Sequence, residues 1–255
     1  MKALFLTSNL NNIVKIGDEK VAVKCDNSNH FMDKLKEEAQ KVDSIVFVAS
    51  DPDNYEKTST YSNLIVESLK LEGYNVTTVT VLDHRFTEDA KSAVLNADLL
   101  FFMGGHVPTQ NKYMKELKLK NILSDYNGVV VGQSAGSMNC SENVYVQPEY
   151  EQDAVPNFQK QISGLGLTKI VVMPHINKAK EDEFEGKTVW DMCLEDSVKY
   201  PHYGIADSGF IEIKDGVATL YGEGYTFNNG KVAKICENGH FVEIPQTICR
   251  KCKNK

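Results

Sequence analysis

Short apolar segments recur along the first half of the chain and alternate with amphipathic stretches. Each is four to six residues long and rich in Val, Ile, Leu or Phe, and they lie at Ala3–Thr7, Ser44–Ala49, Val76–Val81, Asp98–Met103 and Gly128–Val131. Segments that are apolar throughout are typical of strands buried on both faces of a parallel sheet. The pattern therefore predicts a central sheet whose strands run mostly parallel.

The stretches between these segments have helical periodicity. Apolar or aromatic residues spaced four apart occur at Phe31, Leu35 and Ala39, and again at Tyr61, Ile65 and Leu69. Thr87, followed by Glu88 and Asp89, is typical of a helix start with acidic residues in its first turn. Gly73 marks the expected end of the second helix. Strands that alternate with helices predict a doubly wound α/β fold, with helices on both faces of the sheet.

The texture of the sequence changes after about residue 200, where short segments alternate between apolar and polar residues. They lie at Ile211–Lys214, Val217–Tyr221, Lys231–Ile235 and Phe241–Ile244, and Lys-Asp-Gly, Asn-Asn-Gly and Glu-Asn-Gly join them. Such tripeptides are hairpin signals. We expect one α/β domain over 1–255: the main sheet and helices in about 1–200, an antiparallel β-meander packed on that sheet in about 203–245, and a polar tail in 246–255.

The composition of the chain argues against two classes of binding partner, nucleic acids and membranes. The net charge of −7 and the pI of about 5.4 disfavour binding to nucleic acid, which needs a basic stripe that the sequence lacks. No apolar run reaches the roughly 18 residues of a membrane-spanning helix, and the start MKALFLTSNL lacks the features of a signal peptide. The six scattered cysteines suit reduced thiols. We expect a cytoplasmic protein with neither nucleic-acid nor membrane partners.

The motif Gly132-Gln133-Ser134-Ala135-Gly136 directly follows the last of the apolar segments. A G-x-S-x-G turn between a strand and a helix needs small flanking residues because the backbone at its serine is strained and crowded. The turn would lift Ser134 Oγ out of the sheet, and the free N–H groups of the following helix would favour a developing anion. The motif predicts a nucleophilic serine; a glycine-rich turn of structural use only is the alternative.

A second glycine pair, Gly104-Gly105, directly follows the segment that ends at Met103. Loops at the carboxyl ends of parallel strands converge on one edge of the sheet. Backbone N–H groups of Gly104 or Gly105 and of Ala135 would then form an oxyanion hole; a plain turn is the alternative. His106, the next residue, suits a ligand contact and a surface turn equally.

A serine nucleophile needs a base, and the chain has six histidines. His175 follows the apolar segment Ile170–Met173 and is thereby placed at the end of a strand. Its position alone suits a structural histidine as well as a base. Asp207 ends another apolar segment and could orient the base, although an Asx-turn before Gly209 would also explain it.

Four pieces of sequence together resemble the peptidase E and cyanophycinase family of serine peptidases, which have the class I glutamine amidotransferase-like fold. They are Met103-Gly104-Gly105, Gly132-Gln133-Ser134-Ala135-Gly136-Ser137, Met173-Pro174-His175 and Gly204-Ile205-Ala206-Asp207-Ser208-Gly209. The resemblance implies Ser134 as nucleophile, His175 as base and then acid, and Asp207 as the residue that orients His175. It implies a small peptide substrate, with no metal and no organic cofactor. His106 stands where the family usually has Asn.

The resemblance also bears on specificity and on rival chemistries. The family's aspartyl dipeptidase binds its substrate carboxylate through an arginine, at whose place this chain has Val189; Lys187 nearby cannot reproduce a bidentate guanidinium grip. Strict specificity for an N-terminal aspartate is therefore not expected, and another dipeptide or an isopeptide-like amide is as plausible. Glutamine amidotransferases of this fold have a cysteine at the elbow, whereas this chain has Ser134.

Two alternatives to the peptidase hypothesis stay open at this point, together with one separate motif. The first is a ligand-binding or regulatory protein on the same scaffold without turnover, and the second is an esterase, because the same groups attack esters. The separate motif has zinc-ligand residue types at Cys236, His240, Cys249 and Cys252. Glu237-Asn238-Gly239 has the pattern of a hairpin turn, which would turn Cys236 and His240 to opposite sides, so free cytosolic thiols are the favoured interpretation and no metal site is predicted.

Overall fold

The computed structural model describes residues 1–155 and 157–249 of the chain. Its largest sheet has eight strands in the order β18-β15-β14-β1-β7-β6-β4-β5. The parallel strands are β1 (Ala3–Thr7), β4 (Ser44–Val48), β5 (Thr78–Leu82), β6 (Leu99–Phe102) and β7 (Val129–Gln133). The antiparallel strands are β14 (Phe210–Lys214), β15 (Val217–Tyr221) and β18 (Phe241–Glu243). The predicted sheet of mostly parallel strands is thus confirmed.

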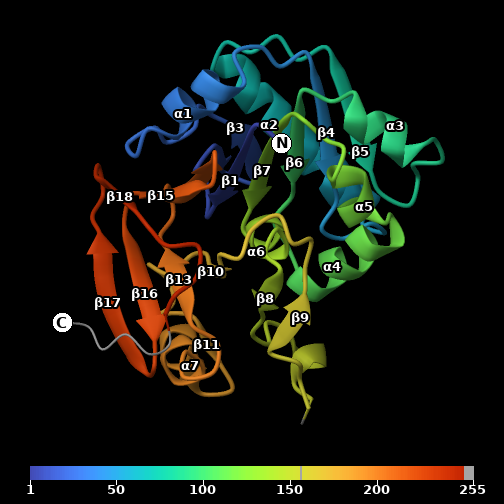
Figure 1. Cartoon of the computed structure of the whole chain (residues 1–255). Coiled ribbons are helices and arrows are strands. Elements are labelled where there is room, and N and C mark those ends of the chain that lie inside the picture. Colours follow the sequence, from blue (N-terminus) through green and yellow to red (C-terminus); the bar gives the residue numbers. More distant parts are fainter. Residues whose placement is uncertain (156, 250–255) are drawn as a thin grey trace.

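Helices cover both faces of this sheet (Figure 1). Successive side chains of a strand point to opposite faces, so each buried strand packs against helices on both sides. Phe5 and Phe47 pack with residues of α1 (Phe31–Glu38) and α2 (Tyr55–Leu71). Leu4 and Leu6 belong to the core on the other face. That core includes residues from α3 (Ala90–Leu95), α4 (Val107–Glu116), α5 (Leu119–Leu123) and α6 (Ala135–Asn139). The alternation explains why these strands are apolar throughout.

Two predicted helix boundaries can be compared with the structure. The helix expected to start near Thr87 begins at Ala90, because Asp89 is its N-cap and accepts a hydrogen bond from the Lys91 backbone N–H. Gly73 follows the end of α2 at φ 97°, as its position in the sequence indicated.

The C-terminal strands are antiparallel as expected, but they do not form one separate meander. β14, β15 and β18 join the main sheet, whereas β16 (Gly224–Asn228) and β17 (Lys231–Cys236) join β13 (His202–Ile205) and β10 (Val172–Met173) in a second, four-stranded sheet. Gly222, at φ 84°, lies in the turn that carries the chain from β15 into the second sheet. In Figure 1 this sheet is drawn in orange and red, below the main one.

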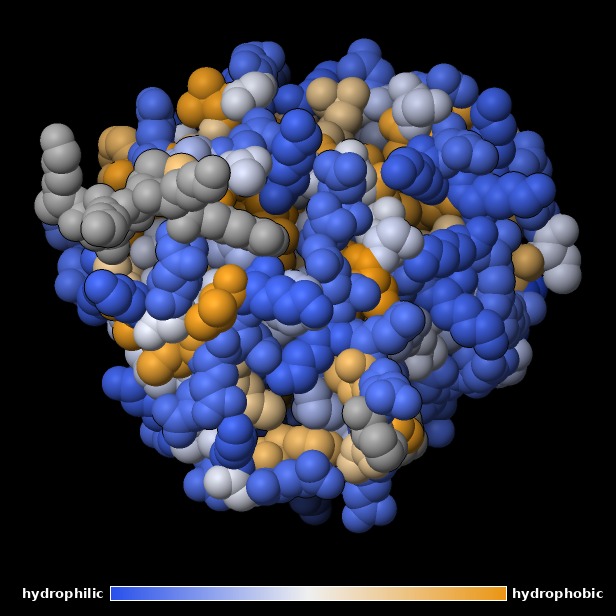
Figure 2. All heavy atoms as spheres, turned by 60° about the horizontal axis from the view of Figure 1, so that its bottom comes forward, coloured by the Kyte–Doolittle hydropathy of each residue, from blue (hydrophilic) through white to orange (hydrophobic). Residues whose placement is uncertain are grey.

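The remaining elements are short. They are the hairpins β2 (Ile13–Ile16) with β3 (Glu19–Ala22), β8 (Asn143–Tyr145) with β9 (Gln161–Ser163) and β11 (Glu183–Phe184) with β12 (Lys187–Thr188), the helix α7 (Val189–Asp196) and the 3₁₀ turn Glu151–Asp153. Within the described ranges, no helix has both the length and the apolar character to cross a membrane. The face shown in Figure 2 is mainly hydrophilic, with hydrophobic residues in small separate groups.

Candidate active site

Ser134 occupies a sharp turn between the end of β7 and the start of α6. Its backbone has φ 51° and ψ −115°, a conformation that L-residues rarely adopt and that costs on the order of 1–3 kcal/mol. The glycines around it are required by space: a Cβ on Gly132 would lie 2.7 Å from the Ser137 nitrogen, and one on Gly136 would collide with the Phe102 carbonyl. The strand, strained turn and helix predicted from the sequence are all present.

Gly136→Ala should lower the free energy of unfolding by about 1–3 kcal/mol, because the added methyl group has no room beside Phe102. Urea denaturation of the variant and of wild type measures the difference. Gly104→Ala is the matched control: its Cβ would stand 3.3 Å from Ser134 Cβ, so a smaller loss is expected. Equal midpoints for Gly136→Ala and wild type would contradict this account of the elbow.

His175 and Asp207 complete a hydrogen-bonded series that starts at Ser134. The distance from Ser134 Oγ to His175 Nε2 is 2.9 Å, and His175 Nδ1 is 2.6 Å from Asp207 Oδ1. His175 follows β10 and Asp207 follows β13, so both residues come from the second sheet, whereas Ser134 comes from the main one. Ser134 and His175 are 41 positions apart in the sequence, and His175 and Asp207 are 32 apart, yet the three side chains form one continuous hydrogen-bonded series.

The Asp207 carboxylate is well supplied with hydrogen-bond donors. Lys178 Nζ lies 2.7 Å from Oδ2, and Ser8 Oγ donates to Oδ1 at 2.9 Å. Burial opposes ionisation of Asp207, but the hydrogen bonds from His175, Lys178 and Ser8 outweigh it and hold the pKa well below its usual range. Asn177 accepts a hydrogen bond from the Asp207 backbone N–H at 2.9 Å, which fixes the segment that carries the carboxylate.

Sequence reasoning missed Ser8, Lys178 and Asn177. Ser8 directly follows β1, so the strand-end argument that selected Ser134 could have found it. Lys178 and Asn177 lie within three residues of His175, in a segment without helix or strand, where no pattern in the sequence fixes the direction of a side chain.

The glycine pair after β6 lies beside the serine. Gly104 is close enough that an added Cβ would stand 3.9 Å from Ser134 Oγ, and Ser50 fills the space where Gly105 would carry a Cβ. Among the described residues, none accepts a hydrogen bond from the backbone N–H of Gly104, Gly105 or Ala135. An oxyanion hole needs backbone N–H groups of this kind, close to the serine and without an acceptor inside the protein.

The model of peptidase family S51 matches residues 21–221. The chain belongs to peptidase family S51. It is therefore a serine peptidase, with the mixed α/β fold expected from the sequence. Among curated proteins, no sequence matches the chain.

Two solved structures resemble this family S51 chain in fold. A peptidase from an acI-B1 Actinobacterium has a TM-score of 0.68 at 16% identity, with 95% of this chain and 97% of that chain covered. A protein assigned as peptidase E from Listeria monocytogenes EGD-e has a TM-score of 0.58 at 16% identity, over 92% of this chain and 100% of that one. At such identities the likeness concerns the fold.

Two clefts of the family S51 chain meet at Ser134 and His175. The sheet-side cleft, of about 300 Å³, is lined on the main-sheet side by Ser8, Asn9, Ser50, Asp51, Lys57, Thr58, Tyr61, Ile65, Met103, Gly104, Gly105 and Gln133. The loop-side cleft, of about 370 Å³, is lined by Met138, Gln147, Pro148, Glu149, Met173, Pro174, Asp182, Glu183, Phe184 and Val189. A bound peptide could therefore extend to both sides of the serine.

The loop-side cleft carries acidic rather than basic side chains. Val189 lines this cleft at the start of α7. Lys187 is not part of the lining, because its Nζ forms an ion pair with Glu195 Oε2 at 2.7 Å. Desolvation in the cleft, followed by the charge of Asp153, raises the pKa of Glu149 to about 7, although His175 opposes the shift. Glu149 lies in the loop after β8, which the sequence analysis did not single out.

The His106 side chain is held in place by contacts with other residues of the protein. Its Nδ1 is 2.7 Å from Thr109 Oγ1, its Nε2 is 3.2 Å from Asp153 Oδ2, and its ring meets that of Tyr150 edge-on. Because Tyr150 and Asp153 belong to the segment that follows Glu149, His106 anchors one wall of the loop-side cleft.

The cysteine and histidine motif has no metal-binding geometry in the part that the structure describes, and Cys252 lies outside the described residues. Cys236 is buried, whereas His240 and Cys249 are exposed. The turn at Glu237-Asn238-Gly239 separates Cys236 from His240, whose Nδ1 is 3.1 Å from the Asn238 carbonyl oxygen.

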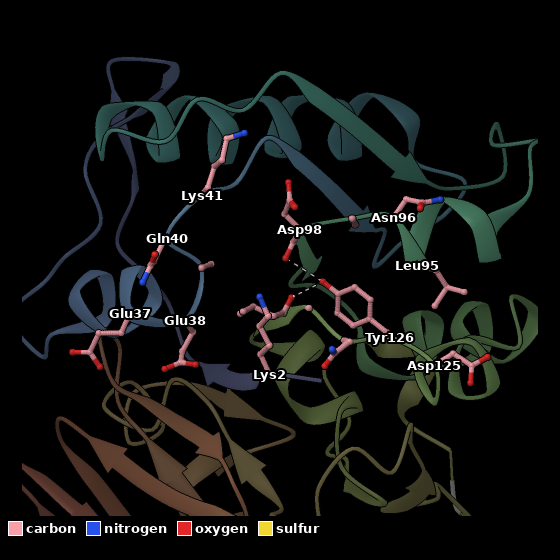
Figure 3. Close-up of a pocket in the computed structure, with 15 residues that line it drawn as sticks. Lys2, Glu37, Glu38, Gln40, Lys41, Leu95, Asn96, Asp98, Asp125 and Tyr126 are labelled. Carbon is pink, nitrogen blue, oxygen red and sulfur yellow. Dashed lines mark hydrogen bonds between the residues drawn. The ribbon is translucent and has the colours of Figure 1, made fainter.

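A larger cavity, of about 880 Å³, lies at the opposite edge of the main sheet (Figure 3). Lys2 and Asp98, which line it, precede β1 and β6, so this is the edge where the parallel strands begin. Tyr126 closes part of it and donates hydrogen bonds to the carbonyls of Asp98 and Val129. Its described lining includes no Ser, Cys or His, so it holds no serine–histidine or cysteine–histidine pair of the kind found between Ser134 and His175.

Proposed function

We propose that this serine peptidase hydrolyses an amide bond of a small peptide through an acyl-enzyme, with Ser134 as nucleophile, His175 as base and Asp207 as the acid that orients His175. The observation that carries the proposal is the continuous series of hydrogen bonds from Ser134 Oγ through both ring nitrogens of His175 to Asp207. A scaffold without turnover would be expected to misplace one of these groups, and the 2.9 Å contact at Ser134 gives that alternative no support.

In the first half of the reaction, Ser134 Oγ attacks the carbonyl carbon while His175 Nε2 takes the hydroxyl proton. The carbonyl oxygen becomes an oxyanion that accepts hydrogen bonds from Ala135 N–H and from Gly104 or Gly105 N–H. His175 then gives its proton to the leaving amine nitrogen. The C–N bond breaks and the acyl group stays on Ser134.

In the second half, a water molecule takes the place of the amine. His175 removes one proton from it as its oxygen attacks the ester carbonyl, and the same proton returns to Ser134 Oγ as the acyl group leaves as an acid. Throughout, Asp207 accepts the Nδ1–H of His175, which leaves Nε2 free to receive a proton. Its depressed pKa keeps it ionised over the pH range in which His175 works as a base.

The lining of the loop-side cleft argues against strict specificity for an N-terminal aspartate. Val189, Phe184 and Met173 offer an apolar surface, and the charged groups around them are Glu149, Asp182 and Glu183. An aspartate side chain placed there would meet like charges and no guanidinium. Neutral or cationic residues next to the cleaved bond fit this cleft better.

The proposed function is tested by digesting a dipeptide library with wild type and with Ser134→Ala. Mass spectrometry reads which amide bonds are cleaved. The proposal expects cleavage by wild type alone, with few aspartyl peptides among the products. A matching panel of esters distinguishes a peptidase from an esterase: cleavage of esters without any cleavage of dipeptides would overturn the proposed amide substrate.

Glu149 should make the binding of cationic peptides depend on pH. With a pKa of about 7, its carboxyl group is about 10% ionised at pH 6 and about 90% ionised at pH 8, so attraction to a cation is lost as the pH falls. We expect a lysine-containing peptide to bind about three- to fivefold more tightly at pH 8 than at pH 6. Calorimetry with the Ser134→Ala variant measures this without turnover.

The control peptide replaces lysine by norleucine, and its affinity should change little between the two pH values. Glu149→Gln should remove most of the difference for the lysine peptide, because the amide that replaces the carboxyl group carries no charge at either pH. An unchanged pH dependence in Glu149→Gln would show that another group is responsible.

A further inference from the structure

Ser8 lies behind the acid and base of the active site and is fully buried, with 0% of its surface exposed. It directly follows β1 at the carboxyl edge of the main sheet, where its backbone N–H donates to the Gly209 carbonyl at 3.2 Å. Ser8 precedes residues 21–221, the part matched by the family model, so that match assigns it no role.

One hydroxyl group makes two short hydrogen bonds here, and the donors can be assigned. The His175 backbone N–H donates to Ser8 Oγ at 2.8 Å, and Ser8 Oγ donates its only proton to Asp207 Oδ1 at 2.9 Å. The third contact, from Ser8 Oγ to His175 Nδ1, is longer at 3.4 Å. The Nδ1–H therefore belongs to Asp207, which is only 2.6 Å away.

The backbone that Ser8 contacts is in an unfavourable conformation. His175 has φ 58°, in the left-handed region that residues other than glycine seldom occupy. A buried acceptor for its N–H helps to hold this conformation, and the conformation sets the direction of the imidazole. Ser8 thus contacts the backbone of the base and the carboxylate of the acid with one atom.

Lys178 is the third side-chain donor to Asp207, besides His175 and Ser8, and it is held less firmly than Ser8. Lys178 approaches Oδ2 at 2.7 Å, but its side chain is 51% exposed, so solvent competes for its ammonium group. Ser8 has no solvent competitor and a short side chain with little freedom. Of the two, Ser8 is better suited to fix the carboxylate in one orientation.

We propose that Ser8 is a positioning residue of this peptidase: its hydroxyl group locks the Asp207 carboxylate and the His175 backbone in mutual register, so that His175 Nε2 points at Ser134 Oγ. This inference rests on the function proposed above. Ser8 touches no reacting atom in that mechanism and acts through Asp207 and His175.

The test uses a fluorophosphonate probe, whose rate of reaction with Ser134 reports the reactivity of the serine without a known substrate. Ser8→Ala should slow labelling by about tenfold or more, since hydrogen bonds to charged groups are among the stronger ones. Ser197→Ala is the matched control. Ser197 is 1% exposed, and its hydroxyl group likewise donates once, to the Leu194 carbonyl, and accepts once, from Gly230 N–H. It should label at the wild-type rate.

A double-mutant cycle separates positioning from a general loss of stability. In an Asp207→Ala background, Ser8→Ala should cause little further slowing, because the carboxylate that Ser8 orients is absent. The same slowing in both backgrounds would overturn the proposal, as would a Ser8→Ala variant that labels like wild type. Thermal unfolding of all variants reveals whether any of them is unfolded at the assay temperature. Failure of wild type to label at Ser134 would instead overturn the proposed function itself, and this inference with it.

Discussion

Ser134→Ala should abolish hydrolysis, with a fall in kcat of at least about 10⁴-fold on any substrate that wild type cleaves. The reason is chemical: the methyl group of alanine cannot attack a carbonyl, and the remaining backbone donors at Gly104, Gly105 and Ala135 can only polarise it. Because alanine is smaller than serine and the Oγ contact with His175 is the bond that is lost, the fold should be kept. Steady-state kinetics and covalent labelling by a fluorophosphonate both measure the loss.

Ser137→Ala provides a comparison within the same turn. Ser137 is buried, and its hydroxyl group donates to backbone carbonyls of Thr7 and Gly132, so its removal affects packing rather than the reaction. We expect Ser137→Ala to lose stability and to keep labelling at Ser134. Labelling that persists in Ser134→Ala, at any other residue, would exclude Ser134 as the nucleophile.

Asp207→Asn should lower kcat by about 10³- to 10⁴-fold with little change in the overall structure. An asparagine amide can donate a hydrogen bond to His175 Nδ1, which then needs no proton of its own. The tautomer with the proton on Nε2 follows, and that nitrogen can no longer accept the proton of Ser134. The ion pair with Lys178 at 2.7 Å is lost as well. Kinetics on the best library peptide measure the effect.

Asp196→Asn is the control for the loss of a paired aspartate. Asp196 resembles Asp207 in its partners, because Lys160 lies 2.8 Å from it and the Tyr145 hydroxyl group donates to it at 2.8 Å, but it lines neither cleft. Its variant should keep wild-type turnover at temperatures where it is folded. An Asp207→Asn variant with nearly full activity would mean that another group orients His175.

The sequence predicted which candidate site residues lie together better than it predicted how the last strands divide between sheets, and the reason lies in the range of the interactions. Gly104, Ser134 and His175 each lie within three residues of the end of a short apolar segment, so one rule about strand ends brought them together. The partition of the last strands between two sheets depends instead on the turn at Gly222 and on long-range pairing, which local alternation does not encode.

Residues in irregular segments were the hardest to predict. Glu149 lines the loop-side cleft from a loop without helix or strand, and Lys178 contacts Asp207 from a turn. Neither position has a periodicity that would indicate the direction of its side chain. Ser8 had a usable signal, namely its place after β1, but serine is common at such positions and its partners are 167 and 199 residues away.

The proposed nucleophile and its proposed proton acceptor come from different sheets: Ser134 follows β7, whereas His175 and Asp207 follow β10 and β13. Catalytic alignment is therefore a property of the junction and of neither half alone. A substitution far from every reacting atom can therefore abolish activity if it shifts one sheet relative to the other. Both sheets would keep their secondary structure. Conversely, a ligand that binds both sheets and holds them in one relative position would improve the alignment of Ser134, His175 and Asp207 without contacting these residues.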